Sequence, residues 1–272
     1  MHCRRMAVRL KRTSMNDARP ARKPAPQIEI RPLRELGEFA EAVKLQQIIW
    51  GFEDIELLPV RLFVTAVKVG GQAFGAFHSG RMIGFCLAIP GIKSGAGNQS
   101  YLHSHMLGVL KEYRDAGVGR ILKLEQRKDA LARGIGLLEW TFDPLEIKNA
   151  YFNIERLGAI VRRFVLNQYG MTSSKLHAGL PTDRCVAEWQ LASPRVEAVL
   201  GGRTPEQAAE VARISVPSAI YQIKDTDPSA AREIQKRVSE TFLKNLSDGL
   251  VVTRFERTPE SGSYIFTKWH SK

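Results

Sequence analysis

The sequence has few cysteines and no long apolar run. Its three cysteines, Cys3, Cys86 and Cys185, are odd in number and far apart, so neither a disulfide framework nor a zinc spacing is present. This usage favours a reducing cytoplasm, and we expect no metal site. The chain has no apolar run long enough to span a membrane. It also lacks the apolar segment of about 7–15 residues found in secretory signals, so no membrane partner is expected.

Acidic residues are scarce at the N-terminus. Residues 1–27 hold eight basic residues and one acid, Asp17, in a chain whose net charge is +12. Three prolines and the lack of a periodic apolar pattern predict a disordered tail. Such a tail could bind nucleic acid or be a solvated extension. We favour the second interpretation and expect no nucleic-acid partner. The remainder is mildly basic, which suits an anionic cofactor.

Apolar residues make up 44% of the 272 residues, which is enough for a core of normal size. Their periodicity predicts mixed helices and strands. Strands are predicted over 28–33, 72–77, 82–89, 101–109, 137–142, 159–165, 186–191, 250–255 and 264–269. Helices are predicted over 36–50, 59–69, 118–134, 148–157 and 228–246. Residues 78–81 read as a hairpin turn, 90–97 as a loop, and 194–212 as a linker-like helix-and-turn region.

The predicted order suggests three parts: the tail 1–27, a domain over 28–193, and a C-terminal extension over 194–272. A helix and two strands are too few to bury a core of their own. We therefore expect the extension to pack on the first domain. Its helix could cover one face of the sheet, or its hairpin could extend one edge.

The segment Val109 to Arg120 is the most informative part of the chain. It places Arg114-x-x-Gly117-x-Gly119 between a predicted strand and a predicted helix. Glycines let the backbone approach a ligand closely, and the first turn of a helix offers unpaired N–H groups to a phosphate. Two known phosphate loops do not fit. No Lys-Ser/Thr pair follows the glycines, and Leu122 stands where a dinucleotide fingerprint needs a small residue.

This segment resembles the acyl-CoA pyrophosphate loop of the GNAT superfamily of N-acyltransferases. Val109 stands five residues before Arg114, as in that family, and the flanking order of strands and helices also matches over roughly 28–193. The resemblance implies a mixed, mostly antiparallel sheet flanked by helices, in which strands four and five splay apart. It also implies acetyl-CoA or another acyl-CoA as co-substrate, and a small-molecule amine as acceptor.

A second resemblance concerns the segment from Asp143 to Asn153 and the later Pro181-Thr-Asp-Arg184. These are similar to a branch of predicted bacterial GNAT acetyltransferases that carry a C-terminal extension. Some relatives are linked to N-acylation of amino acids with acetyl or succinyl groups. A succinyl group would need a cation, for which Arg162, Arg163 and Arg184 are candidates if they are not simply exposed.

The resemblance assigns cofactor-binding residues on the strand, the loop and a later helix. Backbone groups of the strand would pair with the pantetheine amides, and the loop amides with arginine charge would hold the pyrophosphate. The helix asparagines, at an i, i+4 spacing, could bond the pantetheine or the acyl group, unless they are exposed. These residues are Leu107, Val109, Arg114, Gly117, Val118, Gly119, Arg120, Asn149 and Asn153.

The catalytic candidates are His103, Tyr151 and Asp143. His103 lies eleven residues before Arg114, where several family members carry a glutamate base, and neutral imidazole is a competent base near pH 7. His105 is on the same face, although both could be structural. Ile154 replaces the family's tyrosine acid, and Tyr151 is one turn earlier. Asp143 could bind an acceptor ammonium or cap the next turn.

The sequence therefore predicts an N-acyltransferase. The alternative is a non-catalytic acyl-CoA-binding or regulatory protein, motivated by the missing tyrosine. A homodimer is left open.

Overall fold

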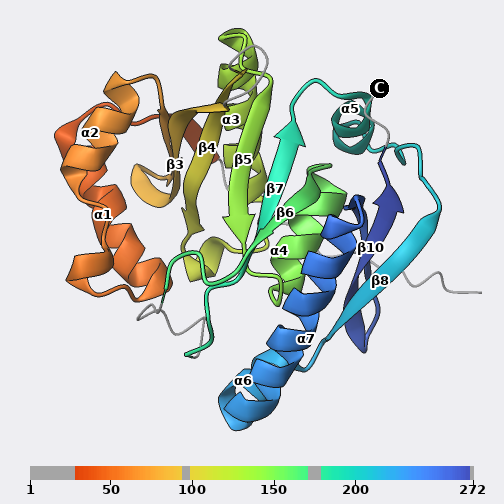
Figure 1. The fold of residues 1–272 in the computed structure, drawn as a ribbon. Helices are drawn as coiled ribbons and strands as arrows, with labels where there is room; N and C mark the ends of the chain where they lie inside the picture. The colour runs from red at the N-terminus through yellow and green to blue at the C-terminus, as the bar shows by residue number, and fades with distance from the viewer. Residues whose placement is uncertain (1–27, 94–98, 171–178, 270–272) are drawn as a thin grey trace, which may run out of the picture.

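The computed structural model describes residues 28–93, 99–170 and 179–269. The predicted disordered tail lies outside these ranges. Within them, one ten-stranded sheet runs through the molecule in the order β1-β2-β3-β4-β5-β7-β6-β9-β10-β8 (Figure 1). Its strands are β1 Ile28–Pro32, β2 Gln72–His78, β3 Arg81–Lys93, β4 Gln99–Val109, β5 Leu137–Phe142, β6 Ile160–Val165, β7 Arg184–Gln190, β8 Glu210–Pro217, β9 Leu250–Arg257 and β10 Ser261–Lys268.

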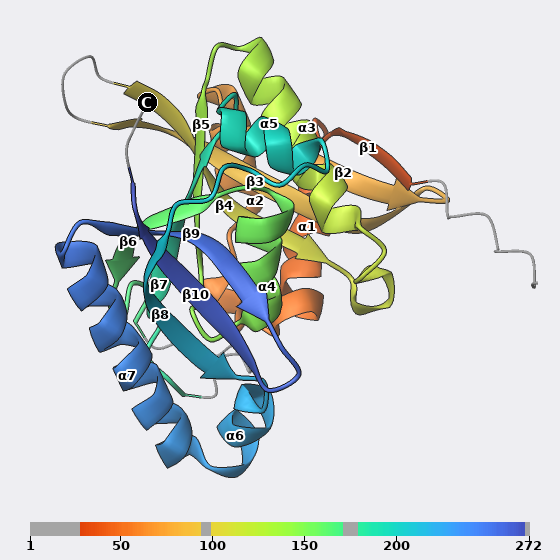
Figure 2. The ribbon, with the colours of Figure 1, turned by 90° about the vertical axis from the view of Figure 1, so that its right-hand side faces the viewer.

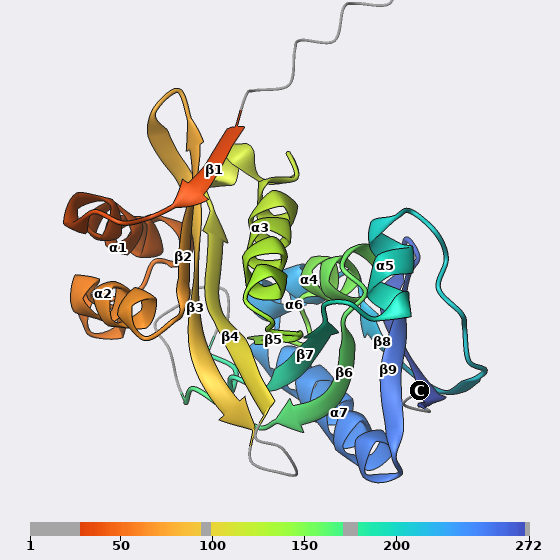
Figure 3. The ribbon, with the colours of Figure 1, turned by 90° about the horizontal axis from the view of Figure 1, so that it is seen from above.

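Helices lie on both faces of this sheet. They are α1 Leu36–Trp50, α2 Val60–Lys68, α3 Val118–Ala132, α4 Ile147–Tyr151, α5 Pro194–Leu200, α6 Ile220–Thr226 and α7 Pro228–Ser247. A π-helical segment, Phe152–Arg156, continues α4, and short 3-10 turns occur at Asp54–Glu56 and Lys111–Tyr113. Figure 3 shows α1 and α2 on one side of β1–β4, with α3 and α4 on the other. This arrangement confirms the mixed, helix-flanked sheet that the resemblance implied.

The sheet is antiparallel except between β4 and β5. These two strands run parallel and pair at two positions, Leu102 with Leu138 and His103 with Glu139. Beyond these positions no further β4–β5 pairing occurs among the described residues, so the strands separate toward their C-terminal ends. The predicted splay of strands four and five is thus present.

The predicted loop from Pro90 begins too early. β3 continues through Pro90 to Lys93, and Pro90 pairs with Leu102 of β4. The pairing of β3 with β2 has already ended at Ala88, so this part of β3 has β4 as its neighbour on one side. A proline is tolerated there because its missing N–H faces no second strand.

The extension contains more structure than a helix and a hairpin. Its additional elements are α5, which lies in the linker-like region 194–212, and β8 and α6, which lie mostly between residues 213 and 227, where no element was predicted. β8 forms the outer edge of the sheet against β10, and β9 joins β6 at Val161 and Val252. The hairpin therefore extends the sheet, while α7 packs beside it (Figure 2). Both arrangements that we considered from the sequence occur together.

Two hydrophobic cores hold the fold. The first contains Phe39, Phe63 and Phe85, with the other apolar residues of α1, α2, β2 and β3 and the start of α3. The second joins β5, β6, β7 and α4 to the extension, and includes Trp189 and Phe242. The ring of Phe242 on α7 contacts Tyr264 and Phe266 of β10. Apolar residues of the extension and of β5–β7 therefore belong to the same core.

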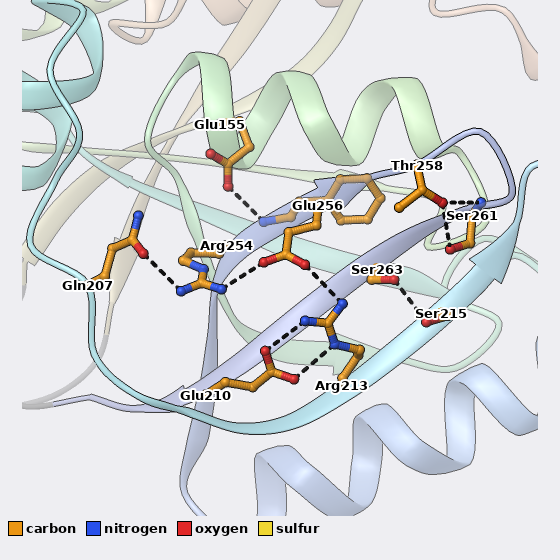
Figure 4. Close-up of polar contacts among 11 residues, drawn as sticks. Glu155, Gln207, Glu210, Arg213, Ser215, Arg254, Glu256, Thr258, Ser261 and Ser263 are labelled. Carbon is orange, nitrogen blue, oxygen red and sulfur yellow. Dashed lines mark hydrogen bonds and ion pairs between the residues drawn. The ribbon is translucent and has the colours of Figure 1, made fainter.

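The outer face of β8–β10 carries a polar network (Figure 4). Arg213 pairs with Glu210 and Glu256, and Glu256 also pairs with Arg254. On the inner side, the carboxylate of Glu155 accepts a hydrogen bond of 2.7 Å from the amide of Phe255. This contact ties the helical segment after α4 to β9.

Candidate active site

A cavity of about 460 Å³ lies at the ends of β4 and β5. Residues from the α1–α2 connection, β4, β5, α4 and the β6–β7 connection contribute to its wall. The lining residues are Trp50, Phe52, Glu56, Leu58, His105, Met106, Leu107, Thr141, Phe142, Asp143, Glu146, Asn149, Tyr169 and Arg184. Apolar and aromatic walls with a few converging polar groups are typical of a small-molecule site.

A β-bulge in β4 sets which side chains reach this cavity. Leu87 pairs with Met106 and Ala88 pairs with Ser104, so His105 is the extra residue of β4. A bulge of this kind interrupts the strict alternation of side chains. His105 and Met106 consequently both line the cavity, although they are adjacent in sequence.

The turn before α3 has the geometry of an anion cradle. Gly117 has a φ of +82°, a conformation that favours glycine, and the side chain of Arg114 donates to the Val109 carbonyl at 3.2 Å. In the described part of the chain, the amides of Gly117, Val118 and Gly119 donate no hydrogen bond, whereas the Arg120 amide donates to the Gly117 carbonyl. Of the four loop amides from Gly117 to Arg120, the first three are thus available to a phosphate.

Gly119 connects this turn to the cavity. A Cβ added at Gly119 would lie 3.4 Å from Cδ2 of Leu107, which also lines the cavity. The anion cradle and the cavity are therefore neighbours, separated by the Leu107 side chain. An extended ligand with a phosphate at one end could occupy both.

The two predicted asparagines have different environments. Asn149 lines the cavity. Asn153 is buried, and its side-chain oxygen accepts from the indole N–H of Trp140 at 3.2 Å. Asn153 lies in the π-helical segment, where wider spacing often accompanies a functional site. Its amide orients Trp140 in the structure.

The tyrosine predicted as an acid is not part of the cavity wall. Tyr151 lies beneath the guanidinium of Arg257, 4.1 Å from the ring centroid. Ile154, at the family's tyrosine position, is fully buried in the second core. The tyrosine that does line the cavity is Tyr169, whose hydroxyl is 2.9 Å from the Thr141 hydroxyl. Sequence spacing gave no signal for Tyr169, because its position depends on the β6–β7 connection.

The predicted base, His103, lies where β4 and β5 are still paired. Its register partner is Glu139, and its ring centroid is 5.8 Å from that of His105. Burial, followed by the nearby His105, lowers the pKa of His103 to about 4. Burial also lowers the pKa of His105. Both rings are therefore neutral at pH 7, and His105 is the one that faces the cavity.

Carboxylates form another side of the cavity. Asp143 accepts a 2.8 Å hydrogen bond from the Leu145 amide, which is the turn-capping contact considered from the sequence. The same side chain also lines the cavity, and its binding of an acceptor ammonium stays a prediction. Glu146 lies beside it, and burial raises the pKa of Glu146. Glu56 belongs to the 3-10 turn between α1 and α2.

Of the three arginines considered for a dicarboxylic acyl group, Arg184 lines the cavity. Its guanidinium lies 5.4 Å from the ring centroid of Tyr169 and donates to the Asp183 carbonyl. Arg162 and Arg163 pair with Glu188, and Arg163 also pairs with Glu139. These pairs hold the β6 arginines against neighbouring strands.

A buried lysine was missed by the sequence analysis. Lys123 of α3 is 3% exposed, donates to the Ser104 hydroxyl at 2.8 Å, and lies 3.7 Å from the ring centroid of Trp140. Burial lowers the pKa of Lys123 to about 7. The helical pattern alone places Lys123 next to the buried positions Leu122 and Gln126, but one polar residue at such a position does not reveal its depth.

Over residues 28–93, 99–170 and 179–269, no group of three or more His, Cys, Asp or Glu side chains could hold a metal ion. In the same ranges, no helix is long and apolar enough to cross a membrane.

Comparison with known proteins gives structural similarity without sequence similarity. No protein-family model matches the chain, and no curated protein matches it in sequence. Among solved structures, Arabidopsis thaliana NAA60 in complex with a bisubstrate analogue has a TM-score of 0.49 and 16% identity, covering 60% of this chain and 97% of its own. The ribosomal-protein-S18-alanine N-acetyltransferase from Escherichia coli has a TM-score of 0.48 and 16% identity, covering 61% and 96%.

An aminoglycoside acetyltransferase from an uncultured soil metagenomic sample, in complex with trehalose, is more distant. Its TM-score is 0.41 with 12% identity, covering 46% of this chain and 84% of its own. The splayed β4 and β5 and the glycine turn before α3 are the two features that the sequence resemblance led us to expect in the structure. Identity is low in all three comparisons, so the chemistry has to be judged from this chain's own residues.

Proposed function

We propose that this protein is an acyl-CoA-dependent N-acyltransferase of the GNAT superfamily, which moves an acetyl or succinyl group to the amine of a small molecule such as an amino acid. The observation that carries the proposal is the junction at Leu107. On one side of it lie the open amides of Gly117, Val118 and Gly119, and on the other lies the cavity between β4 and β5. This junction suits a ligand with a diphosphate at one end and a reactive group at the other.

The residues present fit an acyl-CoA. The positive end of the α3 dipole and the three amides would bind the pyrophosphate, and the lack of a Gly119 side chain leaves room for it. Backbone groups of Leu107 and Val109 could pair with the pantetheine amides, because β5 does not pair with this part of β4. Asn149, which lines the cavity, could bond the pantetheine or the acyl group. When bound, the acyl-CoA supplies an activated thioester carbonyl.

The chain's contribution to the reaction is positioning and proton transfer. As the acceptor's nitrogen bonds to the thioester carbon and the carbon–sulfur bond breaks, the nitrogen releases a proton to solvent, because the amide keeps only one of the three hydrogens of the ammonium. Another proton must leave the ammonium before this bond can form. His105 is our candidate for taking that proton, because it is neutral at pH 7 and lines the cavity. The thiolate then needs a proton, which the hydroxyl of Tyr169 could donate.

The direct test is turnover. Release of free CoA from acetyl-CoA and succinyl-CoA is followed with a thiol reagent against a panel of amino acids and other small amines. Turnover that needs both substrates supports the proposal. A preference for succinyl-CoA that Arg184→Gln abolishes would assign the dicarboxylic acyl group to Arg184.

The second candidate is a non-catalytic acyl-CoA-binding protein. The observation that favours it is Ile154, which stands at the position of the tyrosine acid, is fully buried, and cannot donate a proton. Saturable acyl-CoA binding without turnover for any amine in the panel would favour this candidate.

A further inference from the structure

Helix α6 of the extension contacts the wall of the cavity. Lys224 is almost fully buried, with 4% of its side chain exposed, and its Nζ lies 3.5 Å from Oδ2 of Asp143 and 3.4 Å from Oε1 of Glu146. The hydroxyl of Tyr221 donates to the other oxygen of Glu146, Oε2, at 3.1 Å. Asp143 and Glu146 both line the cavity. Figure 2 shows α6 at one end of α7, below α4.

These contacts fix both carboxylates. The remaining oxygen of Asp143 accepts from the Leu145 amide, so each of the four carboxylate oxygens has a partner within the protein. Two neighbouring, partly buried carboxylates repel each other, which makes it costly to hold both in the charged form. The ammonium of Lys224 between them reduces this repulsion: burial raises the pKa of Glu146, and the charge of Lys224 opposes that rise.

The group as a whole still attracts a cation. Two carboxylates and one ammonium leave a net charge of −1, and the charges of Glu56 and Arg184, which also line the cavity, cancel each other. The Lys224 distances of 3.4 and 3.5 Å are longer than the roughly 2.7–2.9 Å of strong charge-assisted hydrogen bonds. The two carboxylates therefore remain available to a second ammonium that approaches from the cavity.

We propose that α6 is part of the acceptor site, where Lys224 and Tyr221 hold the carboxylates of Asp143 and Glu146 at the cavity wall to receive the ammonium of the acceptor. This inference rests on the proposed acyltransferase function and adds to it a cationic acceptor and a role for the extension. Lys224 is a positioning residue, because it acts through the two carboxylates. The acyl-CoA should be unaffected by it, since the phosphate cradle lies at the start of α3.

The test separates the two substrates kinetically. Lys224→Met removes the charge and keeps much of the side-chain volume, whereas Lys224→Arg keeps a positive charge. The matched control is Lys244→Met, at an exposed position of α7. We expect Lys224→Met to raise the KM for the amine by about 10–100-fold, the usual cost of losing contacts to a charged group. The KM for acetyl-CoA should stay within about twofold, and Lys224→Arg should recover part of the loss.

Tyr221→Phe provides a second, milder variant that removes one hydroxyl from a partly exposed ring. It should raise the KM for the amine by a smaller factor and leave the melting temperature close to that of the wild type. If Lys224→Met does not fold, Tyr221→Phe and Asp143→Asn decide the question by the same KM comparison.

The outcomes are distinct. Wild-type turnover with an unchanged amine KM in the folded variants would overturn this inference and leave the proposed function standing. Equal increases in the KM of both substrates would also overturn it, because that pattern indicates general distortion. Absence of wild-type turnover would overturn the proposed function, and this inference with it.

Discussion

The position of the His105 side chain depends on a local irregularity of the backbone. It is the extra residue of the β4 bulge and faces the cavity, whereas His103 faces Glu139 at the paired part of the strands. If His105 is the base, His105→Gln should lower kcat/KM by about 10²–10⁴-fold. His103→Gln is the matched control, with a smaller loss expected.

The pH dependence of activity tests the proposed role of His105 independently. The neutral imidazole is the active form, and burial lowers the pKa of His105 from its ordinary value of 6.5. Activity should therefore persist as the pH falls to 6.5 and decline only below it, in kcat/KM measured on the free enzyme. The decline should be absent in His105→Gln. An unchanged acidic limb in that variant would show that another group or a water accepts the proton.

Lys123 should reduce stability at neutral pH. Its pKa falls from 10.5 in the unfolded chain to about 7 in the fold, so between these values the unfolded chain binds the extra proton. The free energy of unfolding of the wild type therefore decreases as the pH falls from 10.5 to 7. Lys123→Met removes this effect, and Ser104 keeps its hydrogen bond to Gln126.

We expect Lys123→Met to be more stable than the wild type by about 1–3 kcal/mol at pH 7. The advantage should shrink toward pH 10. Urea unfolding at the two pH values measures it, and Lys128→Met, at an exposed position of the same helix, is the control. A Lys123→Met protein that is less stable at pH 7 would show that its contacts with Ser104 and Trp140 outweigh the cost of burial.

At the scale of elements, hydrophobic periodicity predicted the strands and helices of 28–193 well. The long apolar run of β3 predicts a buried strand, and apolar residues at helical spacing predict α1. The glycines before α3 indicate where that helix begins. β8 was missed because it is an edge strand with several exposed residues. The seven-residue helix α6 was missed because it is short. The bulge in β4 cannot be predicted from the alternation of apolar residues in the sequence, yet it determines which histidine lines the cavity.

The contact between Glu155 and β9 tests how the extension is held. Glu155→Ala leaves the Phe255 amide without its partner in a partly buried position, which should cost about 1–2 kcal/mol of unfolding free energy. Glu210→Ala removes an exposed ion pair on the outer face of the same sheet and should have little effect. Chemical denaturation of both variants measures the difference. Equal losses would mean that the Glu155 contact contributes no more than a surface pair.

At the scale of the whole molecule, the second core joins the extension to β5–β7. Ending the chain at residue 193 would expose Phe164, whose ring stacks on Phe242 of α7, and other apolar residues of the second core. We expect the truncated protein to aggregate or to lack a cooperative thermal transition, as judged by calorimetry. Deleting residues 1–27, which the sequence predicts to bury no apolar surface, is the matched control and should leave the melting temperature nearly unchanged. A truncated protein with a wild-type transition would show that 28–193 folds alone.

The sequence predicted the glycine turn before α3 and, among the residues that line the cavity, Leu107, Asp143 and Asn149, with Arg184 as a candidate cation. The assignment of the turn to a phosphate stays a prediction. Spacing sufficed for Arg114 to Gly119, because the motif is local. Tyr169, Arg184 and Glu146 meet only through long-range packing, and Lys224 reaches them from a separate part of the chain. Tyr151 was favoured by its proximity in sequence to Ile154, yet helical rotation places its ring beneath Arg257. Local patterns predict local geometry, whereas a cavity wall assembled from five segments depends on the tertiary fold.

Binding of acetyl-CoA to Gly119→Glu, measured by titration calorimetry, tests the central claim most directly. Gly119 has an ordinary backbone conformation, and an added Cβ meets Leu107 at 3.4 Å, so the variant should fold. Its carboxylate would occupy the phosphate cradle and repel the pyrophosphate. Gly136→Glu, beyond the other end of α3 in open space, makes the same charge change as a control. We expect wild-type affinity in Gly136→Glu and a loss of about 100-fold or more in Gly119→Glu, whereas equal affinity in all three proteins would contradict the assignment of this turn to acyl-CoA.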